Sequence, residues 1–267
     1  MAAALGLIAV WARPAAAPIL AQVMPNQLTM TVGPGQYVER SVIVSNLGTE
    51  TVSVRTRLSD WTLGADGDLG LAPLGSTPGT LLGALSWIPE EMVLSPGAVA
   101  AIRLTGELRA GGRATRWGML LCEVRPLNGN AASGAELGAT VFVTSLPPDQ
   151  ARGEIVGVAV LPLGGDSVQV VARVRNSGER HFTASGEIAI ADSAGHARAG
   201  GALESGLVLP GMTRNLSWWG SFPHRAGPYV VTATIDTGEP ELLAGELAVA
   251  WPLAAPLERS RPQPDER

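Results

Sequence analysis

Apolar and polar residues alternate one by one along most of the chain, in short runs separated by turn signals. Residues 38–44 form one such run, and residues 51–58 form the next after an Asn-Leu-Gly turn. Strict alternation places one face of a strand in a core and the other face in water. Asn and Gly mark turns because both tolerate positive φ.

The same pattern continues into the second half, and no window keeps an apolar stripe of period 3.6 for three turns. Many short strands with regular turns between them are typical of β-sandwiches. The runs that predict strands are residues 38–44, 51–58, 99–108, 117–124, 141–144, 155–161, 168–174, 182–190, 216–219, 229–235 and 242–250.

Two short motifs occur twice, in the same order. Val-Ser-Asn-Leu-Gly at residues 44–48 matches Val-Arg-Asn-Ser-Gly at residues 174–178, and Val-Leu-Ser-Pro-Gly at 93–97 matches Val-Leu-Pro-Gly at 208–211. An alternating strand follows the second motif in each half. The repeat predicts two copies of one sandwich topology, with an insertion in the first copy.

The predicted fold class is therefore all-β, with two immunoglobulin-like β-sandwich domains in tandem. We place the N-terminal domain at residues 23–148 and the C-terminal domain at residues 149–254, because Pro147 and Pro148 end a strand and stiffen a link between modules. Residues 255–267 are rich in Pro and charge, which predicts a disordered tail.

The N-terminus predicts export. Residues 2–11 form an apolar run that is shorter than the ~20 residues needed to cross a bilayer. Ala- and Pro-rich residues follow, up to Ala21, which is typical of a secretory signal peptide. We predict a signal peptide at residues 1–21 and a periplasmic or cell-surface (secreted) location. The alternative is that this segment is an N-terminal strand or helix of the fold.

Charge and composition exclude several classes of function. The net charge is −5, which disfavours a general nucleic-acid binder. All 19 basic residues are Arg, so lysine Schiff-base chemistry is excluded. The single Cys excludes an internal disulfide framework and any metal site built from several Cys residues. No later segment is apolar for long enough to span a membrane.

Candidate catalytic residues do not assemble into a recognisable site. The three histidines, His181, His196 and His224, have no His or Cys partner at ligand spacing, and we predict that they are solvated loop residues. Cys122 has apolar neighbours and predicts a buried, inert thiol. Because no nucleophile–base pair or acid pair is present, we expect no enzyme activity, no cofactor and no metal site.

Trp218 and Trp219 are adjacent, so on a strand their rings point to opposite faces. One ring is expected in a core. The other is expected to be exposed or to lie at the seam between the domains, with a carbohydrate or partner platform as a further alternative.

Five motifs follow one another in the first half: Asn-x-Gly at 46–48, Asp-Trp at 60–61, Ser-Trp-Ile at 86–88, Val-Leu-Ser-Pro-Gly at 93–97 and Arg-Trp-Gly-Met-Leu-Leu-Cys-Glu-Val-Arg-Pro at 116–126. Their order resembles the PapD-type periplasmic pilus-assembly chaperones. In that family a strand ending in Glu-Ile-Pro precedes the long last strand of the first domain, and the counterpart of that last strand here is residues 136–146. The resemblance covers residues 25–148, and the second domain only in architecture.

Members of that family hold a pilin subunit by donating this last strand to the open sheet of the subunit, which is β-augmentation. The resemblance implies an exported, pilin-like protein subunit as the partner, with no nucleic acid and no membrane span. On this chain Leu137, Ala139, Val141 and Val143 share one face of the strand and are the predicted partner-binding residues. The alternative, equally open, is that they pack in the core of their own domain.

The chain also departs from the family. The family anchors the C-terminal carboxylate of the subunit with an Arg on the first strand and a Lys near the last, whereas residues 27–32 contain no basic residue and the chain has no Lys. We therefore predict a divergent member: an exported chaperone-like protein that holds a secreted or fimbrial subunit by β-strand addition. The alternative is a structural or adhesive cell-envelope scaffold without chaperone activity.

Overall fold

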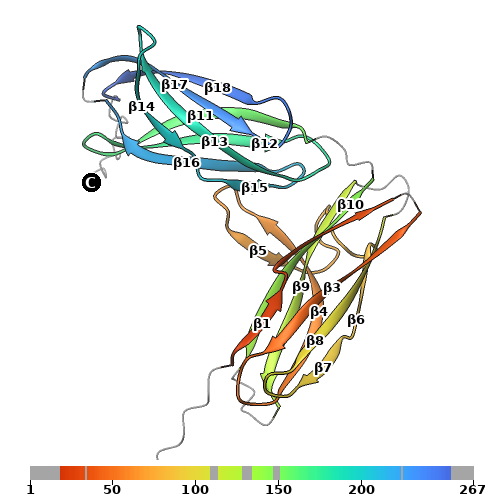
Figure 1. The fold of residues 1–267 in the computed structure, drawn as a ribbon. Coiled ribbons are helices and arrows are strands. Elements are labelled where there is room, and N and C mark those ends of the chain that lie inside the picture. Colours follow the sequence, from red (N-terminus) through yellow and green to blue (C-terminus); the bar gives the residue numbers. More distant parts are fainter. Residues whose placement is uncertain are drawn as a thin grey trace, which may run out of the picture. The chain divides into compact units, whose positions relative to one another are not determined.

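The computed structural model describes residues 19–33, 35–108, 114–127, 134–146, 151–223 and 225–253. Within them the chain forms eighteen β-strands and no helix, which confirms the all-β prediction (Figure 1). None of the described residues therefore belongs to a helix that could cross a membrane. The predicted tail at 255–267, the boundary at 147–149 and most of the predicted signal peptide lie outside the described residues.

The chain divides into two compact units. One unit comprises residues up to 60 together with 72–110 and 116–143, and the other comprises 61–71, 111–115 and the residues from 144 onward. Each unit is built around its own apolar core between antiparallel sheets.

The first ten strands form two sheets, with the orders β1-β3-β8-β6 and β2-β10-β9-β4-β5, and β7 pairs with β4. Fully buried Val42, Val44, Ile102, Leu104 and Leu120 contribute to the core between them. The strands are β1 (Ala21–Met24), β2 (Gln27–Val32), β3 (Tyr37–Asn46), β4 (Val52–Leu63), β5 (Leu69–Ala72), β6 (Leu85–Ile88), β7 (Glu91–Leu94), β8 (Val99–Glu107), β9 (Thr115–Pro126) and β10 (Ala135–Ser145).

The other eight strands form the sheets β11-β12-β16 and β14-β13-β17-β18, with β15 beside β13. Their core includes Val170, Ile190, Leu216, Phe222 and Val231. The strands are β11 (Gly153–Gly164), β12 (Ser167–Asn176), β13 (Phe182–Asp192), β14 (Ala197–Ala202), β15 (Gly206–Val208), β16 (Thr213–Ser221), β17 (Gly227–Asp236) and β18 (Leu243–Trp251).

Every run that the alternation predicted as a strand lies within a strand or overlaps one. The pattern missed the short strands β1, β2, β5, β6, β7, β14 and β15, which have only three to six residues. Ala21, the predicted last residue of the signal peptide, begins β1 and pairs in register with Asn46 of β3.

The first repeated motif forms the same corner in both units. In the first unit the side-chain amide of Asn46 is buried, and its Nδ2 donates to the carbonyls of Glu50 at 2.8 Å and Leu94 at 3.0 Å. Its Oδ1 accepts from the N–H of Gly48 at 3.0 Å. An asparagine amide offers two donors and an acceptor, so one side chain satisfies three backbone groups of the turn.

Asn176 repeats these contacts in the second unit. Its Nδ2 donates to the carbonyls of Arg180 at 2.8 Å and Val208 at 3.0 Å, and its Oδ1 accepts from the N–H of Gly178 at 2.9 Å. The second repeated motif meets the first, because the N–H of Gly211 donates to the carbonyl of Asn176 at 2.9 Å. The bond from Gly97 to Asn46 in the first unit has the same length.

The predicted insertion of the first half is organised by a buried carboxylate, Asp60. Its Oδ2 accepts from the N–H of Gly75 at 3.1 Å and from the N–H and Oγ1 of Thr77 at 2.9 and 3.1 Å. Its Oδ1 accepts from Thr80 Oγ1 at 2.7 Å. These bonds fold the segment so that Leu81 reaches the core of the first unit.

The adjacent tryptophans separate as the alternation predicts. Trp218 packs against the core of the second unit, and Trp219 is 49% exposed, which is one of the two alternatives for the outer ring. Two glycines make room for Trp218: a Cβ on Gly220 would lie 2.2 Å from its ring, and a Cβ on Gly201 would lie 2.7 Å from its Nε1.

We expect Asn176→Ala to lower the free energy of unfolding of the second unit by about 2–4 kcal/mol, because it leaves the buried carbonyl of Val208 and two partly buried backbone groups without this partner. Chemical denaturation of the full chain measures this. Thr183→Ala, at an exposed position of β13, is the control and should change stability by less than about 1 kcal/mol. An Asn176→Ala protein as stable as the control would contradict the structural role of the corner.

Gly220→Ala should destabilise the second unit by about 1–3 kcal/mol, because its methyl group requires the packed Trp218 ring to move. Gly157→Ala is a matched control in β11, since a Cβ there meets nothing within 4 Å. Thermal unfolding of both variants separates steric overlap from the general effect of adding a methyl group to a strand. Equal stability of the two variants would contradict the packing described for Trp218.

Candidate functional site

Strand β10 has different neighbours along its length. It lies between β2 and β9 in its sheet. The N–H of Thr140 donates to the carbonyl of Asn26 at 2.9 Å, immediately before β2. Further along the two strands, Met30 of β2 and Val143 of β10 lie near the same residue, Gly106 of β8. A Cβ built on Gly106 would be 3.1 Å from Met30 Cε and 3.5 Å from Val143 Cγ1. Strand β2 therefore begins beside Thr140 and runs in the same direction as β10.

This arrangement divides β10 into two parts. We call residues 140–145 the paired half and residues 135–139 the open half. In the part of the chain that the structure describes, no strand lies beside the open half on the side of β2. Alternate residues of a strand direct their N–H and C=O groups to opposite edges. Because Thr140 faces β2, the backbone groups of Gly138 and Glu136 face the same, unoccupied side.

The two halves also differ in burial. In the paired half Val141, Phe142 and Val143 have no exposed surface and Thr144 is 5% exposed, so both faces of the strand are covered. In the open half Glu136 and Gly138 are exposed, and Leu137 is partly buried against the core. The paired half is therefore anchored in the sandwich, while the open half has Glu136 and Gly138 at the surface and only its last residue, Ala139, fully buried.

Three of the four predicted partner-binding side chains lie in the core. Ala139, Val141 and Val143 are fully buried among the residues of the first unit, which is the alternative that the sequence left open. Leu137 is the exception, because it is only partly buried. A partner at this strand therefore meets Leu137 and the backbone of the open half rather than the other three side chains.

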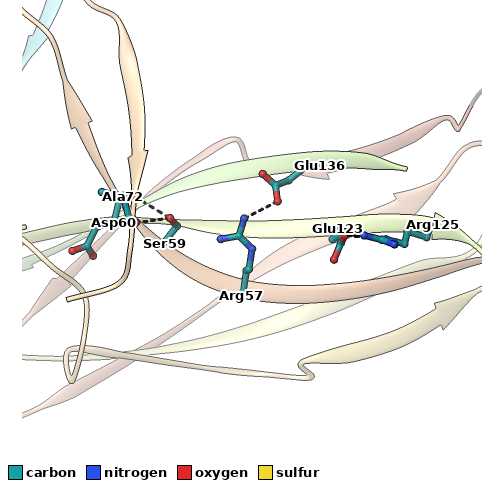
Figure 2. A network of polar contacts seen from close by, with 7 residues as sticks. All are labelled: Arg57, Ser59, Asp60, Ala72, Glu123, Arg125 and Glu136. Carbon is teal, nitrogen blue, oxygen red and sulfur yellow. Dashed lines mark hydrogen bonds and ion pairs between the residues drawn. The ribbon is translucent and has the colours of Figure 1, made fainter. Parts of the chain in front are cut away.

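An ion pair crosses the outer face of the sheet at the open half. Arg57 of β4 pairs in register with Leu121 of β9, and its Nη2 donates to Glu136 Oε2 of β10 at 2.8 Å. Because β9 lies between β4 and β10, the Arg57 side chain passes across β9 (Figure 2). Leu121 is only 3% exposed, although it points to the outer face. The aliphatic part of the Arg side chain is well placed to cover it.

Gly138 allows a second side chain to lie over the open half. A Cβ on Gly138 would be 2.6 Å from Met119 Sδ of β9. Met119 is 9% exposed, so its thioether covers the strand at the position where Gly138 has no side chain. The outer face beside the open edge thus presents Met119 and the Arg57–Glu136 pair.

Sequence reasoning missed the Arg57–Glu136 pair. The two residues are 79 positions apart, and they meet only because β4, β9 and β10 are consecutive in the sheet. Glu123 and Arg125 form another ion pair on the same face, and Arg55 pairs with Glu91 of β7 at 2.7 Å. An open groove of about 480 Å³ lies over these charges.

The candidate catalytic residues do not come together. His196 is exposed, as predicted, and Cys122 is buried, which raises the pKa of its thiol to about 11. His181 corrects the prediction of a solvated side chain. It is partly buried, and burial together with the Arg180 charge lowers its pKa to about 4. His224 lies outside the described residues, which contain no group of three or more His, Cys, Asp or Glu placed to hold a metal ion.

No family model matches the chain, and no curated protein matches it in sequence. Solved structures do match it. The structures that it matches include pilus and fimbrial chaperones. These are the proteins that the order of sequence motifs resembles.

One match is the CsuC–CsuE chaperone–tip adhesion subunit pre-assembly complex from archaic chaperone-usher Csu pili of Acinetobacter baumannii, with 12% identity over 84% of this chain and 97% of that chain and a TM-score of 0.47. The class 5 fimbriae chaperone CfaA has 13% identity over 85% and 98% of the two chains, with a TM-score of 0.47. The Pseudomonas aeruginosa CupB2 chaperone has 14% identity over 85% and 97%, with a TM-score of 0.42.

The lowered pKa of His181 predicts an acid-sensitive second unit. The unfolded chain takes up this proton at its ordinary pKa of 6.5, and the folded chain only near pH 4. This group therefore does not lower the free energy of unfolding above pH 6.5. It lowers the free energy of unfolding as the pH falls from 6.5 towards 4, because only the unfolded chain takes up the proton in that range. We expect this group to account for on the order of 2 kcal/mol of that decrease, after allowance for its partial exposure.

Denaturation of the wild-type chain and of His181→Gln, at a series of pH values between 4 and 7.5, tests this. The difference in stability between the two proteins should change with pH across this window. Thr183→Ala, which removes no titrating group from an exposed position, is the control, and its difference from wild type should stay nearly constant. A constant difference for His181→Gln as well would show that His181 is not held neutral by the fold.

Proposed function

We propose that the chain is an exported, chaperone-like binding protein that holds a secreted or fimbrial subunit by β-strand addition at the open half of β10. The observation that carries the proposal is the division of this strand. Its paired half is fixed in the core, while the backbone of Glu136 and Gly138 faces an edge without a neighbouring strand in the described residues.

An edge of this kind is suited to β-augmentation. Unpaired N–H and C=O groups on a strand edge provide a template for an added strand. Pro residues and charged side chains are common features that prevent an edge strand from pairing with another chain. The open half contains no Pro and one charged residue, Glu136. Because the paired half anchors the strand, little conformational entropy is lost when a partner pairs with it.

The partner class comes from the family that the sequence motifs resemble. We infer an exported, pilin-like subunit with an incomplete sheet, met in the periplasm or at the cell surface, with the sandwich of residues 23–148 providing the strand and that of residues 149–254 completing the protein. Leu137 is the apolar side chain offered to the subunit, and it stands between the small side chains of Ala135 and Ala139. Recognition of nucleic acid is not proposed, since the net charge is −5.

A second candidate function is a structural or adhesive scaffold of the cell envelope without chaperone activity. It is favoured by the burial of Ala139, Val141 and Val143 in the chain's own core, which leaves Leu137 as the single bulky apolar side chain of the open half. In that case the chain would not hold an incomplete subunit in solution.

The test compares Gly138→Pro with Gly138→Ala. Both substitutions add a Cβ beside Met119, but only Pro removes the N–H that faces the open edge. The probe is a purified pilin subunit from which the N-terminal donor segment has been deleted. We expect wild type to keep the subunit soluble in an equimolar complex, and Gly138→Pro to bind about fivefold more weakly than Gly138→Ala, as expected for one lost hydrogen bond.

Ala139→Pro is a further control, because the N–H of Ala139 points to β9 and its loss should destabilise the free protein. Circular dichroism and gel filtration of the free variants show whether each is folded. Equal binding by Gly138→Pro and Gly138→Ala would remove the open edge from the mechanism. Failure of the folded wild-type chain to bind the subunit at all would favour the scaffold function.

A further inference from the structure

We propose that the segment which pairs with the open half of β10 carries a basic side chain opposite Glu136. This inference rests on the proposed function, because it specifies the chemistry of the strand that is added. It is drawn from the position of the Arg57–Glu136 pair relative to the open edge.

A strand added at this edge would lie about 4.8 Å from β10, as neighbouring strands do in any sheet. Its side chains on the outer face would approach those of β10, with Cβ atoms about 4.5–5.5 Å apart across each pair. Glu136 is exposed on that face, and its side chain is 40% accessible. One side chain of the added strand therefore comes to lie beside the Glu136 carboxylate.

The carboxylate is held in place from the other side. Arg57 reaches across β9 and donates to Oε2 at 2.8 Å. An ionised carboxylate has about four acceptor sites, so it can receive a second donor from the added strand. Arg57 is a positioning residue in this arrangement, because it fixes the carboxylate without reaching the open edge itself.

The orientation of the pair decides which charge the partner meets. Arg57 is rooted on β4, two strands in from β10, whereas Glu136 stands on β10 itself and is its only charged residue. The negative end of the pair is therefore nearer to the added strand. A basic side chain at this position would extend the row of charges from Arg57 through Glu136, and an acidic one would be repelled.

A second copy of this chain does not fit this requirement. The only charge that the β10 strand of another copy would bring to the edge is its own Glu136, which has the wrong sign. Charge complementarity thus favours a basic segment of another protein over self-association through the same edge.

Two synthetic peptides of about ten alternating Thr and Val residues test the inference, one with a central Arg and one with a central Glu. Fluorescence anisotropy with the full chain measures their affinities. We expect the Arg peptide to bind about threefold more tightly, as for other partly exposed ion pairs. The preference should largely disappear in about 0.5 M salt.

Variants of the chain show whether Glu136 causes the preference for the Arg peptide. Glu136→Gln should abolish it, and the double variant Arg57→Glu/Glu136→Arg should reverse it, because the exchange keeps the internal pair and inverts the charge at the edge. Glu123→Gln is the matched control. It removes the same charge from the same face, but from β9 rather than from the edge strand, and should leave the preference for the Arg peptide unchanged.

Equal affinity for the two peptides, or a preference that survives in Glu136→Gln, overturns the inference and leaves the open edge intact as a binding site. Self-association of Glu136→Gln but not of wild type overturns it too, because Glu136 would then act by blocking the edge. If neither peptide binds while the truncated pilin subunit binds equally to wild type and Glu136→Gln, the charge inference alone fails. If that subunit also fails to bind, the proposed function fails with it.

Discussion

One buried asparagine amide in each unit holds together the end of the sandwich from which the first strand starts. Asn46 joins its own turn to the end of β7, and the neighbouring Leu47 N–H donates to the carbonyl of Leu20, just before β1. Asn176 and Ser177 do the same in the second unit, where the acceptor is the carbonyl of Arg152 before β11. Three separate chain segments are thus fixed by a few hydrogen bonds, and the bonds from the Asn amides to the carbonyls of Leu94 and Val208 are fully buried, which makes these two costly to leave unmade.

The position of the first strands in turn defines the open edge. In the first unit the chain leaves β1, crosses to the other sheet at Asn26 and continues as β2 beside β10. Because this crossing meets β10 at Thr140, the residues before Thr140 have no strand neighbour on that side within the described residues. The accessible half of β10 is therefore a result of the way the first strand changes sheets.

Alternation predicted most of this architecture because period two reports burial directly. It identified the long strands, and the family resemblance pointed to the strand on which Leu137, Ala139, Val141 and Val143 share a face. Neither distinguished burial by the chain itself from burial by a partner. Short strands such as β15 escaped because three residues contain no measurable period. His181 was wrongly predicted to be solvated, since it is partly buried next to Phe182, which lies in the core of the second unit. The repeated asparagine motif was the strongest local signal, and its meaning became clear from the bonds that it makes.

The Arg57–Glu136 pair had no sequence signal, because it depends on the order of strands and on the register between them. A pair of charges 79 residues apart is one among many combinations until β9 is known to lie between β4 and β10. Position in the sheet also distinguishes Glu136, since it stands on the strand with the open edge, whereas β4 lies two strands away from that edge. A charge at a sheet edge can thus be recognised only when the order of the strands is known.

The two halves of β10 are subject to different kinds of selection. A substitution at Val141 affects the stability of the fold, because this side chain has no exposed surface. A change at exposed Glu136 leaves the core intact, so under the proposed function its effect depends on the strand that pairs with the open half. Within eleven consecutive residues, packing should therefore restrict change in one segment, while under the proposed function its neighbour is free to change together with a partner strand.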